Sequence, residues 1–348
     1  MILIDDVREI KDFKKITFSN YKKTQVNKEF IKSLIDGKSE KVFYWCTELI
    51  CSGHFLDLWE NIINYMCKYI HVGNPKIPIY INNRMNTFKN IINKTNCTEL
   101  ELRNNMNIRK LLFEVISVLL FSQKKYCYYN IKIIDSDFNI QNLSSKLKAP
   151  NTNYSKNIFK ENDSIDLFMS INELCYHLSN DSKNSYLSIF WIEWIIKYVK
   201  KLKKNKELCL IEKRNIQNID DKYLSYPVWL IWDCLFFYAD KKSKIIKSII
   251  DSLFEIFCLK FTNSTINKRI LNIYFAVYIL NDNIDFNTNI ITKKNVKNID
   301  NILNNIDIFF TQVKENELKP KTNYLFNNIE MSNIDKSKEK INLINNII

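Results

Sequence analysis

The chain contains very little glycine. Its 348 residues include three, at positions 37, 53 and 73. Loops that cradle a phosphate need clustered glycines, because backbone N–H groups must approach the anion closely. The three glycines of this chain are far apart, so the sequence excludes the phosphate loops of P-loop NTPases, dinucleotide enzymes and kinases. The Gly-x-Ser-x-Gly elbow of α/β-hydrolases is excluded for the same reason.

Histidine is equally scarce, with His54, His71 and His177 as its three positions. Cys51-x-x-His54 followed by Cys67-x-x-x-His71 is the spacing most similar to that of a tetrahedral zinc site. The two pairs would lie at opposite ends of one helix, about 20 Å apart at about 1.5 Å per residue. We therefore predict no metal site and no cofactor.

Pairs of catalytic side chains are also missing. Cys175 and His177 are two residues apart, so on a helix they do not face each other. Asp233 lies inside the apolar run 228–239, where a carboxylate is either paired or has a raised pKa. We expect a basic or polar partner for Asp233 and assign no catalytic residue, so we predict that the protein is not an enzyme.

Long apolar runs are absent as well. The longest, such as 111–121 and 228–239, fall short of the roughly 20 residues that span a bilayer. The first residues carry Asp5 and Asp6, where a signal peptide is basic. Nine cysteines, an odd number without regular pairing, are typical of reduced thiols. These features predict a soluble intracellular protein with no membrane partner.

Apolar residues at helical spacing dominate what is present, and hydrophobic residues make up 46% of the chain. The pattern predicts an all-α fold, a multi-helix array of two helical halves. Each glycine follows a helical segment and is a candidate left-handed C-cap, while two tryptophans of this region are candidate core residues. We assign structural roles to Gly37, Trp45, Gly53, Trp59, Gly73 and Pro75.

Composition shifts along the chain suggest its domain organisation. Between the two helical halves, apolar periodicity gives way to Ser, Asn, Asp and Lys around Pro150. The last residues are rich in Asn and Lys, which is typical of disorder. The predicted parts are an N-terminal arm (1–25), a first helical half (26–134), a linker (135–162), a second helical half (163–315) and a disordered tail (316–348).

The net charge of +13 points to an anionic partner, and lysines gather on two helical segments. The first group follows the spacing i, i+3, i+4, i+7, on the side expected to be opposite Trp191 and Trp194. We predict sequence-independent DNA contacts from Lys197, Lys200, Lys201, Lys204, Lys244 and Lys247. The alternative is a solvated helix face, because the excess of Lys, Asn and Ile matches the codon bias of an AT-rich genome.

One stretch resembles a known family. Lys32-Ser33-Leu34-Ile35-Asp36-Gly37, then Tyr44-Trp45, Leu49 and Gly53, then Ile70-His71-Val72-Gly73-Asn74-Pro75 are similar to the helical collar of clamp-loader-type AAA+ ATPases. The replication-associated recombination branch is the most similar. Lys68 and Tyr69 stand where that branch has a Glu-Asp pair, and the chain shows no ATPase module. The resemblance, over 33–75, implies a collar that associates with other subunits or with further copies of this chain.

The whole chain also resembles a group of proteins without assigned activity from large DNA viruses, which implies the host cytoplasm or nucleus. The leading hypothesis is a non-enzymatic accessory factor of viral DNA replication or repair. Such a factor would bind DNA through the lysines and partners through the helical core. The alternative is a structural or virion-packaged interaction protein that binds no nucleic acid, and a third hypothesis is an enzyme without a recognisable motif.

Overall fold

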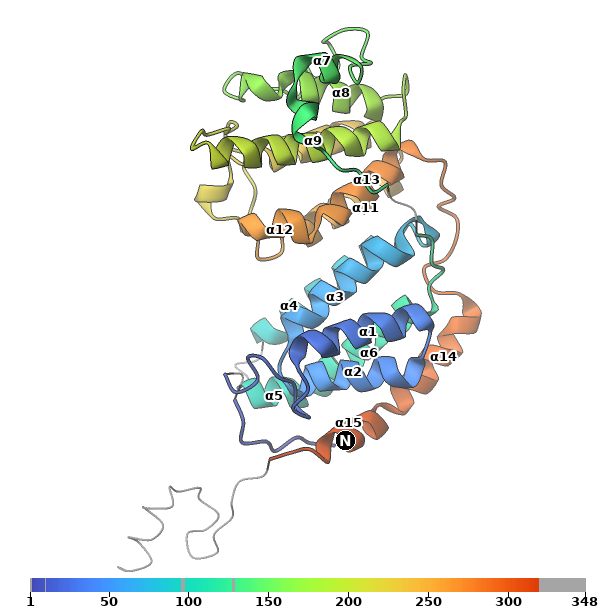
Figure 1. Cartoon of the computed structure of the whole chain (residues 1–348). Helices are drawn as coiled ribbons and strands as arrows, with labels where there is room; N and C mark the ends of the chain where they lie inside the picture. The colour runs from blue at the N-terminus through green and yellow to red at the C-terminus, as the bar shows by residue number, and fades with distance from the viewer. Residues whose placement is uncertain (1, 10, 95–97, 127–128, 319–348) are drawn as a thin grey trace, which may run out of the picture. The chain divides into compact units, whose positions relative to one another are not determined.

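The computed structural model describes residues 2–9, 11–94, 98–126 and 129–318 (Figure 1). Within these ranges the regular secondary structure is helical, apart from one isolated antiparallel bridge between Ile16 and Lys22. The all-α class is therefore confirmed. In the same ranges, no helix combines the length and the apolar character that crossing a membrane requires.

The chain divides into two compact units. Unit 1 comprises the described residues of Met1–Leu58, Asn90–Glu114 and Ile299–Ile348, and unit 2 comprises those of Trp59–Lys89 and Val115–Asn298. The helices of unit 1 are α1 (Lys23–Asp36), α2 (Ser39–Cys51), α5 (Glu99–Asn104) and α15 (Ile306–Lys314). Four helices have residues in both units: α3 (Phe55–Tyr65), α4 (Ile77–Lys94), α6 (Met106–Phe121) and α14 (Lys293–Asn304).

The remaining helices belong to unit 2. They are α7 (Ile140–Ser144), α8 (Phe168–Leu178), α9 (Ser185–Lys204), α10 (Val228–Ala239), α11 (Lys244–Cys258), α12 (Asn263–Lys268) and α13 (Ile270–Asn281). Helix α13 is apolar on all sides, and such a helix is stable only when neighbours surround it. It contacts α8, α9, α10, α11 and α12, so it forms the centre of this unit.

Helix ends lie at the three glycines, as the sequence indicates. Helix α1 ends at Asp36 and α2 at Cys51, and the backbone φ angles of Gly37 and Gly53 are 71° and 70°. Side chains disfavour that left-handed region, which explains glycine at both positions. Gly73 differs from them, because its backbone is not left-handed. A Cβ on Gly73 would lie 2.5 Å from the carbonyl oxygen of Gln123, so close approach of two backbone segments requires glycine there.

The helix that begins at Phe55 does not run unbroken to Gly73. Helix α3 ends at Tyr65 and continues as a π-helical turn, Met66–Ile70, and then as a 3-10 turn that ends at Gly73. Pro75, which is buried, separates this turn from the start of α4. The proline therefore lies between two helices, where its missing N–H breaks no helical hydrogen bond.

The two tryptophans assigned to the core differ in burial. Trp59 is 2% exposed and packs against Phe88, with ring centroids 5.6 Å apart. Trp45 is only half-buried and lies against the ring of Tyr21 at 5.4 Å. The buried face of α2 is formed by residues such as Phe43, Cys46 and Leu49, so Trp45 lies at its edge.

The predicted N-terminal arm, residues 1–25, packs against the rest of unit 1 through buried side chains. Phe13 and Phe18 are fully buried in unit 1, and the guanidinium of Arg8 lies 4.8 and 4.9 Å from their ring centroids. The buried carboxylate of Glu48 accepts a hydrogen bond from the backbone N–H of Ser19 at 3.1 Å. Two buried aromatic rings and the buried carboxylate of Glu48 fix this segment. Helical periodicity in the sequence does not predict these contacts.

The expected linker, 135–162, lies within unit 2. Glu173 on α8 accepts hydrogen bonds from the N–H groups of Lys148 and Ala149, both at 2.9 Å. Asn172, one residue earlier, accepts from the N–H of Tyr154 at 3.1 Å and donates to the carbonyl of Asn151 at 2.8 Å. Two buried polar side chains therefore dock a segment that has little apolar content of its own.

The boundaries of the two units also differ from those of the predicted halves. Residues 59–89 group with unit 2 and residues 299–315 with unit 1. Of the predicted tail, residues 316–318 are described. The N–H of Leu318 donates to Asp6 at 2.9 Å, and the N–H of Val7 donates to the carbonyl of Leu318 at 3.1 Å. Residues 319–348 lie outside the described residues.

Candidate nucleic-acid interface

The C-terminal half of α9 carries an uninterrupted group of positive charges. Asn184 caps the helix by accepting a hydrogen bond from the N–H of Leu187 at 2.9 Å, and residues such as Trp191 and Ile192 bury one face. Six lysines follow between Glu193 and Glu207, with no acidic residue among them. We call them the α9 lysine cluster: Lys197, Lys200, Lys201, Lys203, Lys204 and Lys206.

Two members of the cluster contact neutral oxygen atoms of other segments. The half-buried Lys197 donates from Nζ to the carbonyl of Ile133 at 3.3 Å. Lys200 donates to Oδ1 of Asn267, in α12, at 2.6 Å. Partial burial lowers the pKa of Lys200, the charge of Lys197 lowers it further, and Glu193 opposes the shift. These contacts position both ammonium groups, and within the residues that the structure describes no carboxylate contacts either of them.

Lys201 lies over an aromatic ring. Its ammonium is 4.6 Å from the centroid of Phe138, and that ring packs against Trp194 at 5.4 Å and Tyr198 at 6.0 Å. The expectation that these lysines lie opposite Trp191 and Trp194 is therefore wrong for Lys201, which shares the Trp194 side. Residues 194, 198 and 201 are separated by one and two helical turns, which places them in one row.

The other lysines of the cluster, Lys203, Lys204 and Lys206, are exposed. Exposed ammonium groups close together on a surface can each contact a phosphate of a nucleic acid, and each contact releases condensed counterions from the polyanion. The cluster therefore has the chemistry for sequence-independent binding, because ammonium groups that contact phosphates position a duplex without reading its base edges.

The second predicted group, at the start of α11, is different. Lys244 is exposed, but Lys247 forms an ion pair with Asp240 at 2.5 Å. The hydrogen bond from Lys247 to this carboxylate raises the pKa of Lys247. Asp240 also offsets its positive charge. Lys241 lies 3.8 Å from the ring centroid of Phe237.

An apolar hollow adjoins the α9 lysine cluster. It has a volume of about 180 Å³ and lies among α9, α12 and the start of α10. Ile196, Val199 and Ile266 contribute its apolar walls, and Lys200 and Lys203 also line it. Such a hollow suits an apolar side chain of a partner molecule, with acidic groups of that partner facing the lysines.

Asp233 has the basic partner expected from the sequence. Arg214 donates from Nε to Asp233 at 2.6 Å and from both Nη atoms to Asp163, at 3.0 and 2.8 Å. Asp163 also accepts from the N–H groups of Lys160 and Glu212. Burial raises the pKa of Asp233, while Arg214 opposes the shift. The oxygens of Asp163 thus accept hydrogen bonds that are structural. We interpret Arg214 and its two carboxylates as a polar cluster that connects α10 to two loops.

The cysteines and histidines with metal-like spacing have other contacts. Cys67 donates to Oδ1 of Asn272 at 3.3 Å, and His71 stacks on Phe275 with ring centroids 4.6 Å apart. Burial lowers the pKa of His71 to about 4. His54 Nε2 lies 3.1 Å from the carbonyl of Ile16. In the part of the chain that the structure describes, no three His, Cys, Asp or Glu residues are grouped so as to hold a metal ion.

His177 contacts two residues that the sequence analysis did not single out, although the i, i+4 spacing of Glu173 and His177 places both on one face of α8. Its Nδ1 lies 2.8 Å from Oγ of Ser182, and its Nε2 lies 3.5 Å from Glu173. Ser182, His177 and Glu173 therefore follow one another in the order of a catalytic nucleophile, base and carboxylate. Both oxygens of Glu173 already accept backbone N–H groups, and His177 is 1% exposed. We therefore interpret the three residues as structural. Cys175 instead lies 3.5 Å, sulfur to sulfur, from Cys234.

Comparison of the chain with protein-family models, with curated proteins and with solved structures gives no match. The similarity of residues 33–75 to a clamp-loader collar and that of the whole chain to viral proteins stay predictions from sequence. The function is therefore inferred mainly from the geometry of the described residues.

Proposed function

We propose that this protein is a non-enzymatic accessory factor that binds DNA without sequence preference through the α9 lysine cluster. The observation that supports this most strongly is the run of six lysines along the C-terminal half of α9 and the turn that follows it, with no acidic residue among them. Among the described residues, their ammonium groups contact a backbone carbonyl, an amide oxygen and an aromatic ring. Their charge stays available to phosphates.

Lys244 and Lys247 contribute less in this proposal. The carboxylate of Asp240 lies 2.5 Å from Lys247, and a phosphate would have to compete with it. Lys244 is also the first residue of α11, where the helix dipole disfavours a cation. We expect the α9 lysine cluster to supply most of the phosphate contacts.

The assignment to replication or repair is supported by the resemblance of residues 33–75 to a clamp-loader collar. That resemblance also supports a second component of the proposal, association with partner subunits or with further copies of the chain. Both statements depend on sequence similarity, and they fail together if the collar resemblance is accidental. DNA binding by the lysines does not depend on them.

A protein-interaction module without nucleic-acid binding is the second candidate function. The hollow beside Lys200 and Lys203 favours it, because an apolar recess with basic groups suits a partner with an apolar anchor and acidic neighbours. In that case the positive charge of the chain would serve solubility and partner choice instead of phosphate contact.

Binding of the wild-type protein to labelled duplexes of unrelated sequence tests the first proposal. Fluorescence anisotropy should give the same Kd for every sequence. If all six lysines contact phosphates, affinity should fall about a thousand-fold between about 50 and about 200 mM salt. Wild-type protein that binds no duplex at low ionic strength would contradict the proposal and leave the interaction module in its place.

A further inference from the structure

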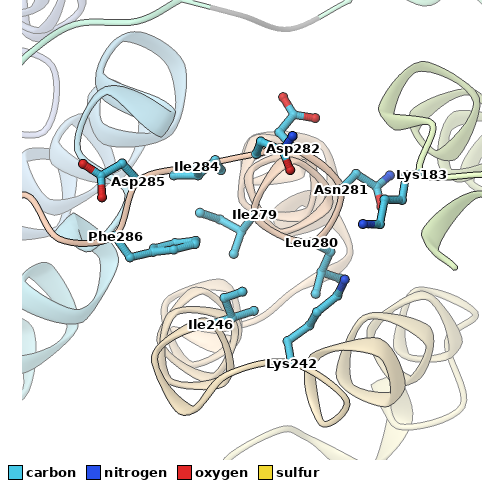
Figure 2. A pocket seen from close by; sticks show the side chains of 11 residues that line it. Lys183, Lys242, Ile246, Ile279, Leu280, Asn281, Asp282, Ile284, Asp285 and Phe286 are labelled. Carbon is cyan, nitrogen blue, oxygen red and sulfur yellow. The ribbon is translucent and has the colours of Figure 1, made fainter. Parts of the chain in front are cut away.

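A second pocket of unit 2 has a volume of about 480 Å³ (Figure 2). It forms where the end of α13 passes into the following loop and faces the start of α11 and the loop between α8 and α9. Pockets that enclose small molecules usually have volumes of about 300–1,000 Å³. This second pocket lies within that range of volumes and is open to solvent on one side, and none of its lining residues belongs to the α9 lysine cluster.

One end of the pocket is basic. Figure 2 shows the side chains of Lys183 and Lys242 reaching the same end, beside Leu280 and Asn281. Lys242 donates to the neutral Oδ1 of Asn180 at 3.3 Å. Burial lowers the pKa of Lys242, and the charge of Lys183 lowers it further. Two cations held near each other repel, so an anion between them would offset an existing electrostatic cost.

A tight turn positions the backbone of Lys183, whose side chain is exposed. Its φ angle of 46° is left-handed, a region that a residue with a Cβ rarely occupies. The N–H of Lys183 donates to the carbonyl of Ser179 at 3.0 Å, and Asn184, the next residue, caps α9. The turn therefore fixes the point from which this lysine extends toward the pocket.

The rest of the pocket is largely apolar. Figure 2 shows Ile246, Ile279 and Phe286 around its middle, away from the ammonium groups. Asp282 and Asp285 also line the pocket, and both carboxylates accept hydrogen bonds from neutral donors, which leave their negative charge in place. Asp282 accepts from Oγ of Ser185 at 2.8 Å, and Asp285 accepts from the N–H of Asn287 at 2.8 Å. In the view of Figure 2, Asp285 lies at the end opposite the lysines.

We propose that this pocket binds a small amphiphilic anion, whose carboxylate or phosphate head lies between Lys183 and Lys242 and whose apolar body packs on Ile246, Ile279 and Phe286. A head group without an apolar body would leave the apolar side chains of the pocket exposed to water. An apolar body without a charge would leave the two lysines without a counterion. The site is separate from DNA binding and does not depend on it.

Isothermal titration calorimetry of the full chain with octanoate and with octyl phosphate tests this site. At least one of the two should bind saturably with one site per chain, and the tighter one identifies the head group. Acetate, inorganic phosphate and octan-1-ol should each bind at least about ten-fold more weakly, since each lacks one half of the recognised chemistry. Failure of both amphiphiles to bind wild-type protein would overturn the proposal, as would octan-1-ol binding with equal affinity.

Variants locate the binding in this pocket. Lys183→Gln/Lys242→Gln should weaken binding of the better probe by about ten-fold or more. The matched control Lys241→Gln/Lys244→Gln removes two neighbouring charges that do not line the pocket and should leave the Kd unchanged. A second variant, Ile246→Glu, places a carboxylate in the apolar part and should abolish binding. Circular dichroism checks that each variant is folded, and equal affinity of wild type and the Lys183/Lys242 variant would contradict the assignment.

Discussion

The α9 lysine cluster and the lysines at the start of α11 share a residue type and a helical spacing, but their surroundings differ. On α9, Lys197 and Lys200 contact neutral oxygens, and no acidic residue interrupts the cluster. On α11, Lys247 contacts the carboxylate of Asp240 at 2.5 Å. A lysine held by a neutral acceptor keeps its full charge for a polyanion, whereas a paired lysine must first exchange one anion for another.

Lysine spacing alone is therefore a weak guide to a phosphate-binding surface. The contacts that decide the availability of each charge come largely from residues remote in sequence. Ile133, Phe138 and Asn267 are all more than fifty positions from the α9 lysines that they contact. Asp240 is close in sequence to Lys247, and the ion pair between them could therefore have been predicted.

The largest expected difference between the two groups is in affinity for DNA. Replacing Lys200 and Lys204 by Gln should weaken duplex binding on the order of a hundred-fold at about 50 mM salt, because two ammonium groups that bind phosphates are removed. The matched variant Lys244→Gln/Lys247→Gln removes the same charge and should cost less than about ten-fold. Anisotropy titrations of both variants against one duplex measure the ratio.

Both double variants change exposed side chains, so each substitution should alter the free energy of unfolding by less than about 0.5 kcal/mol. Thermal unfolding provides this control. If the two variants lose equal affinity while both stay folded, the contrast between neutral and charged acceptors does not govern binding.

Releasing Lys247 from its ion pair should have a smaller effect of opposite sign. In Asp240→Asn, the ammonium of Lys247 no longer faces a carboxylate, and duplex affinity should rise by up to about ten-fold at about 50 mM salt. Asp221→Asn is the control, since it releases Lys213 from an exposed pair in another loop and changes net charge equally. An Asp240→Asn variant that binds DNA no better than this control would show that Lys247 lies outside the interface.

The pH dependence of binding should show the smallest effect. Partial burial lowers the pKa of Lys200, so this residue loses its charge earlier as the pH rises. As the pH rises toward the ordinary pKa of lysine, wild-type affinity for DNA should then fall more than the affinity of Lys200→Arg, because arginine stays charged. The difference should be less than about ten-fold, the effect of a single phosphate contact. Lys204→Arg makes the same replacement at an exposed position, and an identical profile for both variants would contradict a special role for Lys200.

Helical elements were largely predictable from the sequence because their signals are local. Gly37 and Gly53 mark helix ends through a backbone conformation that other residues avoid, and α9 and α10 follow from apolar periodicity. The positions of the lysines on α9 were predictable in the same way. The expected partner of Asp233 also followed from a general cost, the burial of a carboxylate in an apolar helix.

Features that depend on buried polar contacts between distant segments were not predictable. Glu48 fixes the N-terminal segment, and Glu173 with Asn172 fixes the expected linker, through hydrogen bonds to backbone N–H groups. Helical periodicity contains no information about such acceptors, because it reports apolar faces alone. The side of α9 on which Lys201 lies was mispredicted for a related reason, since the ring beneath it comes from Phe138.

The central claim is that the α9 lysine cluster contacts phosphates, and the salt dependence of DNA binding tests it most directly. The variant Lys197→Gln/Lys200→Gln/Lys201→Gln/Lys204→Gln should bind every duplex more weakly than wild type. Its slope of log K against log[salt] should be smaller by up to about 3.6, or about 0.9 for each phosphate that the variant no longer neutralises. Tryptophan fluorescence, to which the buried Trp191 contributes, reports whether the fold is retained. A folded variant with the wild-type slope, or a wild-type protein whose binding ignores salt, would contradict the claim.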